Sequence, residues 1–515
     1  MTRKANEDFI DFKKRIIDPI SDSYCAAKWY NATIWLGHGQ TTSCHHPPGH
    51  YIDPKELLDN PSAIHNTQHK KKMRKMMLEG VRPNECEYCW KVEDIGRENV
   101  SDRIYKTEIY KDTDIIATSK MDWQEDVMLK TLEISFDRTC NFACSYCNPG
   151  FSTTWVKDIK KYGGYKNIQS DGRGHFIDDS PWAKSAGKTD EDNPYIQAFW
   201  RWWEEGLQDN LEEIRITGGE PLMAGSVWKL FEWYKDNPTK GKRLRFAMNS
   251  NLVPKQELMD KLINMSQYVP AFEVYTSNES VGAHSEYIRD GMVYKQWKSN
   301  IHRLITEGNL KKLHLMMTIN SLCLASITEF MDEMIELKRV YGSQYPIMTL
   351  NLLRFPSFQS PAILPVHIKT HYKEKIEAWL KDIIAKDEKD LIGHTLFSAM
   401  ERAHVQRLID YLDVVKTPHM NTSEQDKLYN DFKNFYHQYD VRRGKKFVDT
   451  FKGLFAEWFE SIDVPIPSEE QIINVTYIEN SGLTERAGNP ATEEGGYISD
   501  ELTDTSTDGT GYLND

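Results

Sequence analysis

Residues 131–148 read TLEISFDRTCNFACSYCN and place a strand-like segment, Thr131–Phe136, directly before three cysteines. Cys140, Cys144 and Cys147 have the spacing C-x3-C-x2-C. Three thiolates on one short loop suit a [4Fe–4S] cluster, which needs four ligands, and they leave one iron open. Zinc would require a fourth protein ligand close by, and this loop contains no further Cys or His. The spacing therefore favours a cluster with a vacant iron.

The chain around this segment alternates between short apolar runs and amphipathic runs of helix length. Six such βα units in series, from about Thr131 to Arg354, predict a parallel sheet with helical crossovers. Sheets of this kind carry their sites at the C-terminal strand ends. The predicted strands are Thr131–Phe136, Glu212–Thr217, Arg243–Asn249, Phe272–Thr276, Leu313–Ile319 and Ile347–Leu352, and the helices between them include Ser226–Tyr234, Lys255–Met265, Met292–Glu307 and Ser326–Val340.

A second motif, Thr217-Gly218-Gly219-Glu220-Pro221, ends the second predicted strand. Two glycines let the backbone approach a ligand closely. Glu220 adds a carboxylate that could receive an ammonium group. A lone Gly-Gly-Glu-Pro is often only a turn, but here it follows a strand downstream of the cysteine loop, which makes it informative.

Together the two motifs resemble the signature of the radical S-adenosylmethionine superfamily. The resemblance covers about Thr131 to Arg354 and implies a partial (β/α)6 barrel, similar to a TIM barrel. In that family, S-adenosylmethionine chelates the open iron of the three-cysteine [4Fe–4S] cluster. The Gly-Gly-Glu-Pro segment lies against the amino group of the methionine moiety.

Other positions are similar to family positions around the cofactor. Tyr146 precedes the last cysteine, where relatives carry an aromatic residue near the cofactor. Asn249 and Ser250 end the third strand, where relatives often have Thr-Asn-Gly against the ribose, although Asn251 here replaces the glycine. Arg289 lies where relatives place an arginine near the cofactor carboxylate; a solvated charge at a helix start is the alternative. The resemblance thus implies that these residues bind the cofactor: Tyr146, Gly218, Gly219, Glu220, Pro221, Asn249, Ser250 and Arg289.

Four further cysteines, Cys25, Cys44, Cys86 and Cys89, lie in the first hundred residues, which otherwise read as irregular. Their spacing, with Gly39 between the first two, is similar to the opening of SPASM and twitch auxiliary-cluster domains. Those domains normally follow the barrel, whereas this one would precede it. Four cysteines close a metal site completely, which favours electron transfer or structure over substrate ligation. We expect a second [4Fe–4S] cluster here, with structural zinc as the alternative.

Composition and charge limit the function. The chain has 515 residues, of which 39% are hydrophobic and 27% charged, as in soluble proteins of more than one domain. The formal net charge is −13, and much of it lies in the last 35 or so residues. The body is therefore only mildly acidic, and we expect no binding to long nucleic acid. The sequence has no apolar run of membrane length and no signal-peptide stretch at its start, so we expect a cytoplasmic protein without a membrane partner.

Four regions are predicted along the chain. They are a twitch-like auxiliary iron–sulfur or zinc domain at 1–125, a radical S-adenosylmethionine barrel at 126–360, a helical domain at 361–470 and a disordered acidic tail at 471–515.

The resemblance implies an enzyme that takes one electron from a reductant protein such as flavodoxin or ferredoxin. It then cleaves S-adenosylmethionine to a 5′-deoxyadenosyl radical, which removes hydrogen from a substrate. Relatives with twitch or SPASM domains most often modify peptides, so a peptide substrate is expected, with a nucleotide or other small molecule as the alternative. Outside enzymes, the alternative is an iron–sulfur or zinc protein without catalytic activity, which would have no use for a methionine-binding strand end.

Overall fold

The computed structural model describes residues 3–4, 6–96, 99–171, 174, 176, 192–413 and 422–473. The predicted acidic tail, 471–515, lies outside the described residues from residue 474 onward. The described chain forms two compact units, and each is described by itself. The N-terminal unit comprises Met1–Ala27 and Lys72–Trp123, and the sheet unit comprises Lys28–Lys71 and Gln124–Ile473.

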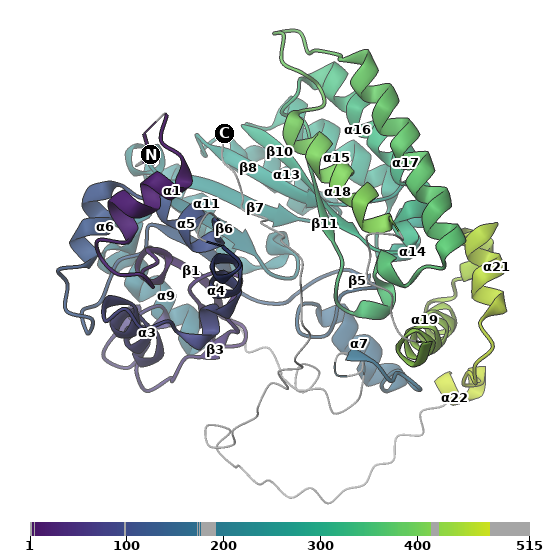
Figure 1. Cartoon of the computed structure of the whole chain (residues 1–515), viewed down its shortest axis with the longest axis horizontal. Helices are drawn as coiled ribbons and strands as arrows, with labels where there is room; N and C mark the ends of the chain where they lie inside the picture. Colours follow the sequence, from purple (N-terminus) through teal and green to yellow (C-terminus); the bar gives the residue numbers. More distant parts are fainter. Residues whose placement is uncertain are drawn as a thin grey trace, which may run out of the picture. The chain divides into compact units, whose positions relative to one another are not determined.

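The sheet unit is built on a nine-stranded sheet with the order β11-β10-β8-β7-β6-β4-β1-β2-β3 (Figure 1). The seven strands β11, β10, β8, β7, β6, β4 and β1 pair in parallel. The strands β2 and β3 extend the sheet beyond β1 and pair antiparallel. The predicted mixed α/β fold with a largely parallel sheet is confirmed, and all six predicted strands are present. The strands are β1 (Asn31–Trp35), β2 (Gln40–Thr42), β3 (His50–Tyr51), β4 (Thr131–Ser135), β6 (Glu213–Thr217), β7 (Arg245–Ser250), β8 (Phe272–Ser277), β10 (Lys312–Ile319) and β11 (Ile347–Leu352).

The expectation that the first hundred residues are irregular is wrong for residues 31–51. This segment supplies β1, β2 and β3, and β1 pairs in parallel with β4 over its whole length, from Asn31 opposite Thr131 to Trp35 opposite Ser135. Residues 28–71, which the predicted regions place with the N-terminal cysteines, thus belong to the sheet unit. These strands are two to five residues long and separated by Gly and His, so they lack the period that marks a strand in sequence.

The two faces of the sheet differ in chemistry. On one face, Phe246 of β7 and Phe272 of β8 pack against Phe231 of α11 (Gly225–Asp236), with ring centroids 5.1 and 5.6 Å apart. On the other face, Arg245 of β7 forms ion pairs with Glu213 of β6, at 2.9 Å, and with Glu273 of β8, at 2.6 Å. Because side chains alternate along a strand, one face carries the apolar core and the other a set of charged pairs.

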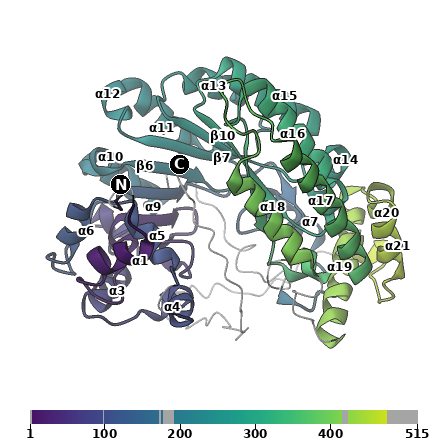
Figure 2. The same cartoon turned by 45° about the horizontal axis from the view of Figure 1, so that its top comes forward.

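Helices connect the parallel strands of the sheet, and further helices follow the last strand along the chain (Figure 2). The crossovers between parallel strands use α11, α13, α15 and α16, whereas α17–α22 follow the last strand in the region predicted to be helical. No helix of the described residues is long and apolar enough to cross a membrane. The helices of the sheet unit are α7 (Thr153–Tyr162), α9 (Pro194–Trp202), α10 (Gln208–Asn210), α11 (Gly225–Asp236), α12 (Pro238–Gly241), α13 (Gln256–Ser266), α14 (Gly282–Ile288), α15 (Tyr294–Glu307), α16 (Ile327–Tyr341), α17 (Val366–Lys386), α18 (Ala399–Leu412), α19 (Thr422–Arg443), α20 (Phe447–Thr450), α21 (Leu454–Ser461) and α22 (Glu469–Ile473).

The N-terminal unit consists of short helices joined by turns. Its helices are α1 (Phe9–Phe12), α4 (Glu87–Asp94), α5 (Asp102–Glu108) and α6 (Asp112–Thr118). Two further helices, α2 (Ala27–Tyr30) and α3 (Gln68–Leu78), span the boundary between the units.

Candidate functional site

The three cysteines of the 140–147 loop follow β4 and precede α7. They therefore lie at the edge of the sheet where the parallel strands end. Cys144 lies on β5 (Ala143–Cys144), which pairs antiparallel with β9 (Arg289–Asp290), so that Cys144 is opposite Arg289. Burial raises the pKa of Cys144 to about 11 and that of Cys147 to about 12, and it raises the pKa of Cys140 as well. Such thiols are protonated at neutral pH, and a bound metal would displace their protons. Metal binding by this loop would therefore release protons and would depend on pH.

Hydrogen bonds fix the first half of this loop. The Thr154 hydroxyl donates to the Cys140 carbonyl at 2.7 Å, and the Ser152 hydroxyl donates to the Phe142 carbonyl at 2.6 Å. The Phe142 N–H in turn donates to the Cys140 Sγ at 3.4 Å. Ser152 is also the N-cap of α7, so the start of this helix and the loop share one set of contacts.

The Gly-Gly-Glu-Pro segment lies directly against the entrance to the cysteine loop. The Glu220 N–H donates to the Thr139 carbonyl at 2.7 Å. A Cβ at Gly219 would lie 2.3 Å from that same carbonyl oxygen, and Gly218 has a φ of +128°. Only glycine fits this close approach and this backbone conformation. The two motifs, nearly eighty residues apart in sequence, therefore form one structure at the end of β6.

Glu220 links the ends of β6 and β7. Its carboxylate accepts hydrogen bonds from the Ser250 hydroxyl at 2.8 Å, the Asn251 N–H at 2.7 Å and the Leu222 N–H at 3.1 Å. Burial raises the pKa of Glu220 to about 7, although these donors oppose the rise. Both carboxylate oxygens are thus engaged by donors of the protein. Pro221 opens the short turn Pro221–Met223 that follows.

Asn249 places a polar atom without a partner at the end of β7. Its side-chain oxygen is buried and has no hydrogen-bond partner among the described residues. A buried acceptor left unpaired is costly, so this oxygen calls for a partner such as a water molecule, an ion or a ligand. Three more buried side-chain atoms of this kind occur after the neighbouring strands β8 and β10; they belong to Asn278, Ser280 and Ser321.

Arg289 lies behind the cysteine loop in a buried ion pair that the sequence did not reveal. Its guanidinium contacts the Glu279 carboxylate at 2.5 Å, and Nη1 lies 4.0 Å from the Cys144 Sγ. Tyr146 completes the group, because its hydroxyl donates to Glu279 at 3.2 Å and Arg289 lies 5.5 Å from the centre of its ring. Burial raises the pKa of Glu279, and Arg289 opposes that rise. The structure thus brings Tyr146 and Arg289 together around a carboxylate and beside a predicted metal ligand.

Glu279 is the residue that sequence reasoning missed. It follows the buried strand β8 in the run Thr276-Ser277-Asn278-Glu279-Ser280. Polar residues directly after a buried parallel strand are a general signal of a site, and this signal was available in the sequence. Its pairing with Arg289 depends on tertiary structure.

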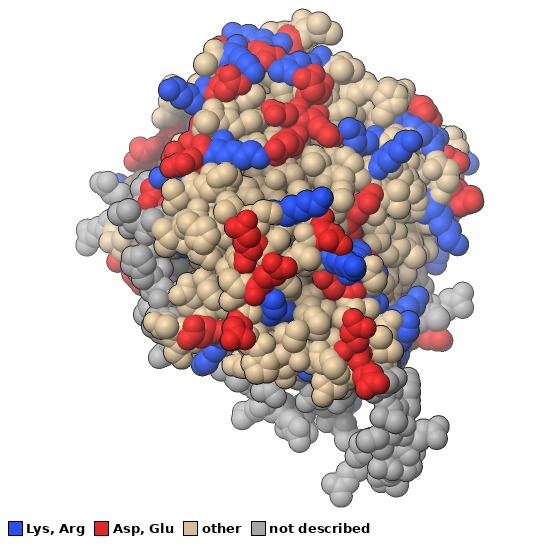
Figure 3. Space-filling model, turned by 90° about the vertical axis from the view of Figure 1, so that its right-hand side faces the viewer, with Lys and Arg blue, Asp and Glu red and all other residues tan. Residues whose placement is uncertain are grey.

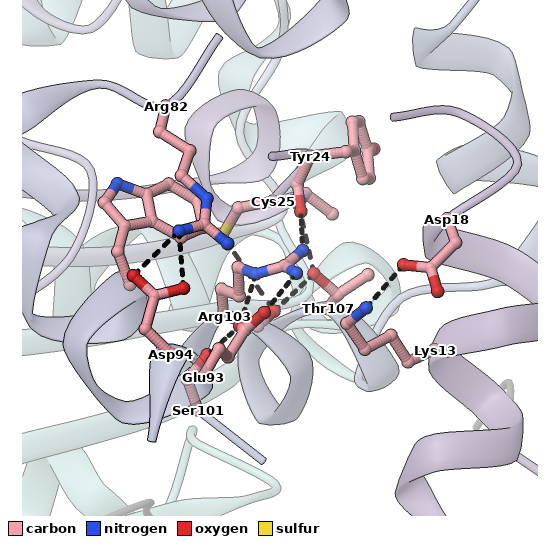
Figure 4. A network of polar contacts seen from close by, with 12 residues as sticks. Lys13, Asp18, Tyr24, Cys25, Arg82, Glu93, Asp94, Ser101, Arg103 and Thr107 are labelled. Carbon is pink, nitrogen blue, oxygen red and sulfur yellow. Dashed lines mark hydrogen bonds and ion pairs between the residues drawn. The ribbon is translucent and has the colours of Figure 1, made fainter. Parts of the chain in front are cut away.

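The N-terminal unit contains three of the four remaining predicted ligands, Cys25, Cys86 and Cys89, and all three are buried. Cys86 is the N-cap of α4 and Cys89 lies one turn further along that helix. Cys25 Sγ lies 4.0 Å from the Arg103 carbonyl (Figure 4). The fourth predicted ligand, Cys44, belongs to the sheet unit, where it follows β2.

Arg103 is a buried charged residue that interacts with two of these cysteines, Cys25 and Cys89. Its guanidinium forms two hydrogen bonds of 2.6 Å with Glu93 and one of 2.7 Å with the Tyr24 carbonyl (Figure 4). Burial alone would lower the pKa of Arg103, but Glu93, together with Cys25 and Cys89, raises it.

No family model and no curated protein matches the chain. Among solved structures, the chain is similar to anSMEcpe with bound AdoMet at 12% identity and a TM-score of 0.32, covering 51% of this chain and 63% of that one. It is also similar to SuiB of Streptococcus suis bound to S-adenosylmethionine, at 12% identity and a TM-score of 0.31, over 70% of each chain. SuiB bound to the precursor peptide SuiA matches at 10% identity and a TM-score of 0.30, over 69% of each chain. TM-scores near 0.3 are too low to establish a shared fold.

Proposed function

We propose that this chain is a radical S-adenosylmethionine enzyme, which reductively cleaves S-adenosylmethionine to a 5′-deoxyadenosyl radical that abstracts hydrogen from a substrate. The observation that carries the proposal is the direct contact between the three-cysteine loop and the glycine pair, through the Glu220 N–H and the Thr139 carbonyl at 2.7 Å. Three thiols leave one iron for an outside ligand. A strand end packed against the same loop offers that ligand backbone and side-chain polar groups.

The residues present fit such a centre. Cys140, Cys144 and Cys147 would ligate a [4Fe–4S] cluster, which when bound would supply the electron for cleavage. Asn249 offers a buried side-chain oxygen without a partner, which suits a hydroxyl donor such as a ribose.

The other residues predicted to bind the cofactor also hold the strand ends and the cysteine loop in place. Glu220 fixes the ends of β6 and β7 relative to each other, because its carboxylate bridges Leu222, Ser250 and Asn251. Arg289, held by Glu279 and Tyr146, keeps a positive charge beside Cys144. Gly218 and Gly219 let the strand end approach the cysteine loop, and Pro221 turns the chain away from it.

We propose a peptide as the substrate and a flavodoxin or ferredoxin as the reductant. The support is the cysteine pattern of the N-terminal region, which resembles auxiliary-cluster domains of peptide-modifying relatives. On the face shown in Figure 3, Lys and Arg residues are interspersed with Asp and Glu, which gives long nucleic acid no continuous basic band there. A nucleotide or other small molecule stays the alternative substrate.

The second metal site is proposed at Cys25, Cys86 and Cys89 of the N-terminal unit; that Cys44 is the fourth ligand stays a prediction from the sequence. It would hold a [4Fe–4S] cluster, or zinc as the alternative. The support is the burial of the three thiols, of which those of Cys25 and Cys89 interact with Arg103.

The test is anaerobic reconstitution, followed by addition of dithionite and S-adenosylmethionine. We expect 5′-deoxyadenosine to form, and we expect Cys144→Ala to abolish it with a loss of about four irons per chain. Cys323→Ala is the matched control, because Cys323 is a buried cysteine outside the loop that contacts the Asn320 carbonyl. Full 5′-deoxyadenosine yield from the Cys144 variant would refute the proposal.

The same samples report on the second site through their metal content. About eight irons per chain are expected for two clusters, and about four with one zinc would assign zinc to the N-terminal cysteines. Metal loss from Cys86→Ala but not from Cys44→Ala would remove Cys44 from the ligand set.

A further inference from the structure

Three successive carbonyl groups of the cysteine loop are each bound by a side chain from a different part of the sheet unit. The Tyr439 hydroxyl of α19 donates to the Ala143 carbonyl at 3.3 Å. The Trp155 indole of α7 donates to the Cys144 carbonyl at 3.0 Å, and the Gln359 amide donates to the Ser145 carbonyl at 2.9 Å. Two of the three donors thus come from chain that lies beyond the last strand of the sheet.

Helix α19 supports more than one of these contacts. Tyr436, one turn before Tyr439, donates its hydroxyl to the Gln359 side-chain oxygen at 3.2 Å and so holds the amide that binds Ser145. Both tyrosines are fully buried. The single hydroxyl hydrogen of Tyr439 is shared between the Ala143 carbonyl and the Tyr287 carbonyl, which lies 3.0 Å away and close to β9, the strand that pairs with the loop. One face of α19 therefore contacts β5 and the end of α14, directly before β9.

The end of α19 is anchored on either side of the loop. Arg442 pairs with Asp158 of α7 at 2.9 Å and donates to the Gly163 carbonyl at the same distance. Just past it, Arg443 and Lys445 pair with Asp290 of β9, at 3.2 and 2.7 Å. Asp290 is the backbone partner of Ala143. Figures 1 and 2 both show α19 beside α7.

These contacts have a consequence for a metal bound by the loop. Side chains that bind the carbonyl oxygens of Ala143, Cys144 and Ser145 fix the backbone that carries the Cys144 thiol and leads to the Cys147 thiol. The N–H of Phe142 already donates to the Cys140 Sγ. Outer partners of this kind orient the ligands of a metal and govern its retention.

We propose that α19 is part of the metal centre, with Tyr436 and Tyr439 as positioning residues that hold the cysteine loop in its ligating conformation. This inference rests on the proposed cluster at Cys140, Cys144 and Cys147. It gives the C-terminal helices a role within the enzyme, where the sequence left that role open.

The test compares Tyr439→Phe with Tyr429→Phe, a variant on the same helix whose hydroxyl is bound by Gln425, away from the loop. Each reconstituted protein is mixed anaerobically with an iron chelator, and the release of iron is followed by absorbance. We expect roughly ten-fold faster release from Tyr439→Phe, an altered electron paramagnetic resonance spectrum of the reduced cluster, and wild-type behaviour from Tyr429→Phe. The thermal midpoints of the apoproteins show whether a change is confined to the loop.

Equal release rates in the wild type and both variants would overturn the inference and leave the proposed function untouched. Absence of iron from the wild-type protein would instead overturn the proposed function. If Tyr439→Phe does not fold, Tyr436→Phe takes its place, because it removes the hydroxyl that holds Gln359, and wild-type release from that variant would equally overturn the inference.

Discussion

Replacement of Gly219 by alanine tests the junction between the two motifs. The added Cβ would lie 2.3 Å from the Thr139 carbonyl oxygen and 2.7 Å from the backbone carbon and oxygen of Arg138. Real Cβ contacts stay above 3.0 Å, so the backbone that leads into Cys140 must move by at least 0.7 Å. Backbone atoms cannot rotate away as a side chain can. The displacement also strains the hydrogen bond between the Glu220 N–H and the Thr139 carbonyl.

The expected cost combines two effects. Overpacking of a tight contact costs about 1–3 kcal/mol, and loss of one hydrogen bond adds about 0.5–1.5 kcal/mol. We therefore expect the apoprotein to lose roughly 2–4 kcal/mol of unfolding free energy. The displaced cysteines should also retain less iron after reconstitution.

Denaturant unfolding of the apoprotein and iron analysis of the reconstituted protein measure these effects. Gly37→Ala is the matched control, because its Cβ would meet only the backbone of residues 136–138, no closer than 3.4 Å, an ordinary contact. This variant should stay within about 1 kcal/mol of the wild type, since Gly→Ala at a site with room is neutral or mildly stabilising. Equal stability and equal iron content in the two variants would refute the close approach of the strand end to the loop.

Two further predictions concern buried ion pairs. Burial alone would raise the pKa of Glu273, but His314 and Arg245 lower it to about 2, so its stabilisation is present above pH 4.5 and is lost as the pH falls toward 2. Glu273→Gln should therefore be less stable than the wild type at pH 7 by up to about 3 kcal/mol. When denaturation is measured at a series of pH values, this difference should shrink below pH 4. A difference that stays constant with pH would contradict the pairing. Arg289→Gln should cost about 3–5 kcal/mol in urea unfolding, because it leaves Glu279 buried and unpaired. The double variant with Glu279→Gln should recover much of that loss, and additive losses would show that the two residues are not coupled.

Local patterns in the chain were sufficient for the six predicted strands. The six predicted strands lie within two residues of their observed positions, because apolar runs between turn residues are properties of neighbouring positions. The same reasoning missed β1, β2 and β3, whose few residues carry too little pattern. These strands are stable because β1 adds to the edge of β4, which is a contact of residues one hundred positions apart.

The partners of individual charged side chains could not be predicted from local patterns. The family resemblance implies that Glu220 and Arg289 bind the cofactor, which stays a prediction, and the structure shows that each of them also has a partner within the protein. Glu220 bridges two strand ends, and Arg289 is paired with Glu279. Whether a charged side chain meets a ligand or another residue depends on which distant segments pack beside it.

By itself the sequence determined which residues share a loop, which segments alternate as strand and helix, and that three thiols precede a glycine pair. These are short-range properties, set by spacing and periodicity along the chain. Only the tertiary structure decided that the glycine pair abuts the cysteine loop, that Glu279 holds Arg289 at Cys144, and that Tyr439 supports Ala143 across 296 positions. Burial and hydrogen-bond geometry between distant segments produce these contacts, and no pattern along the chain encodes them one by one.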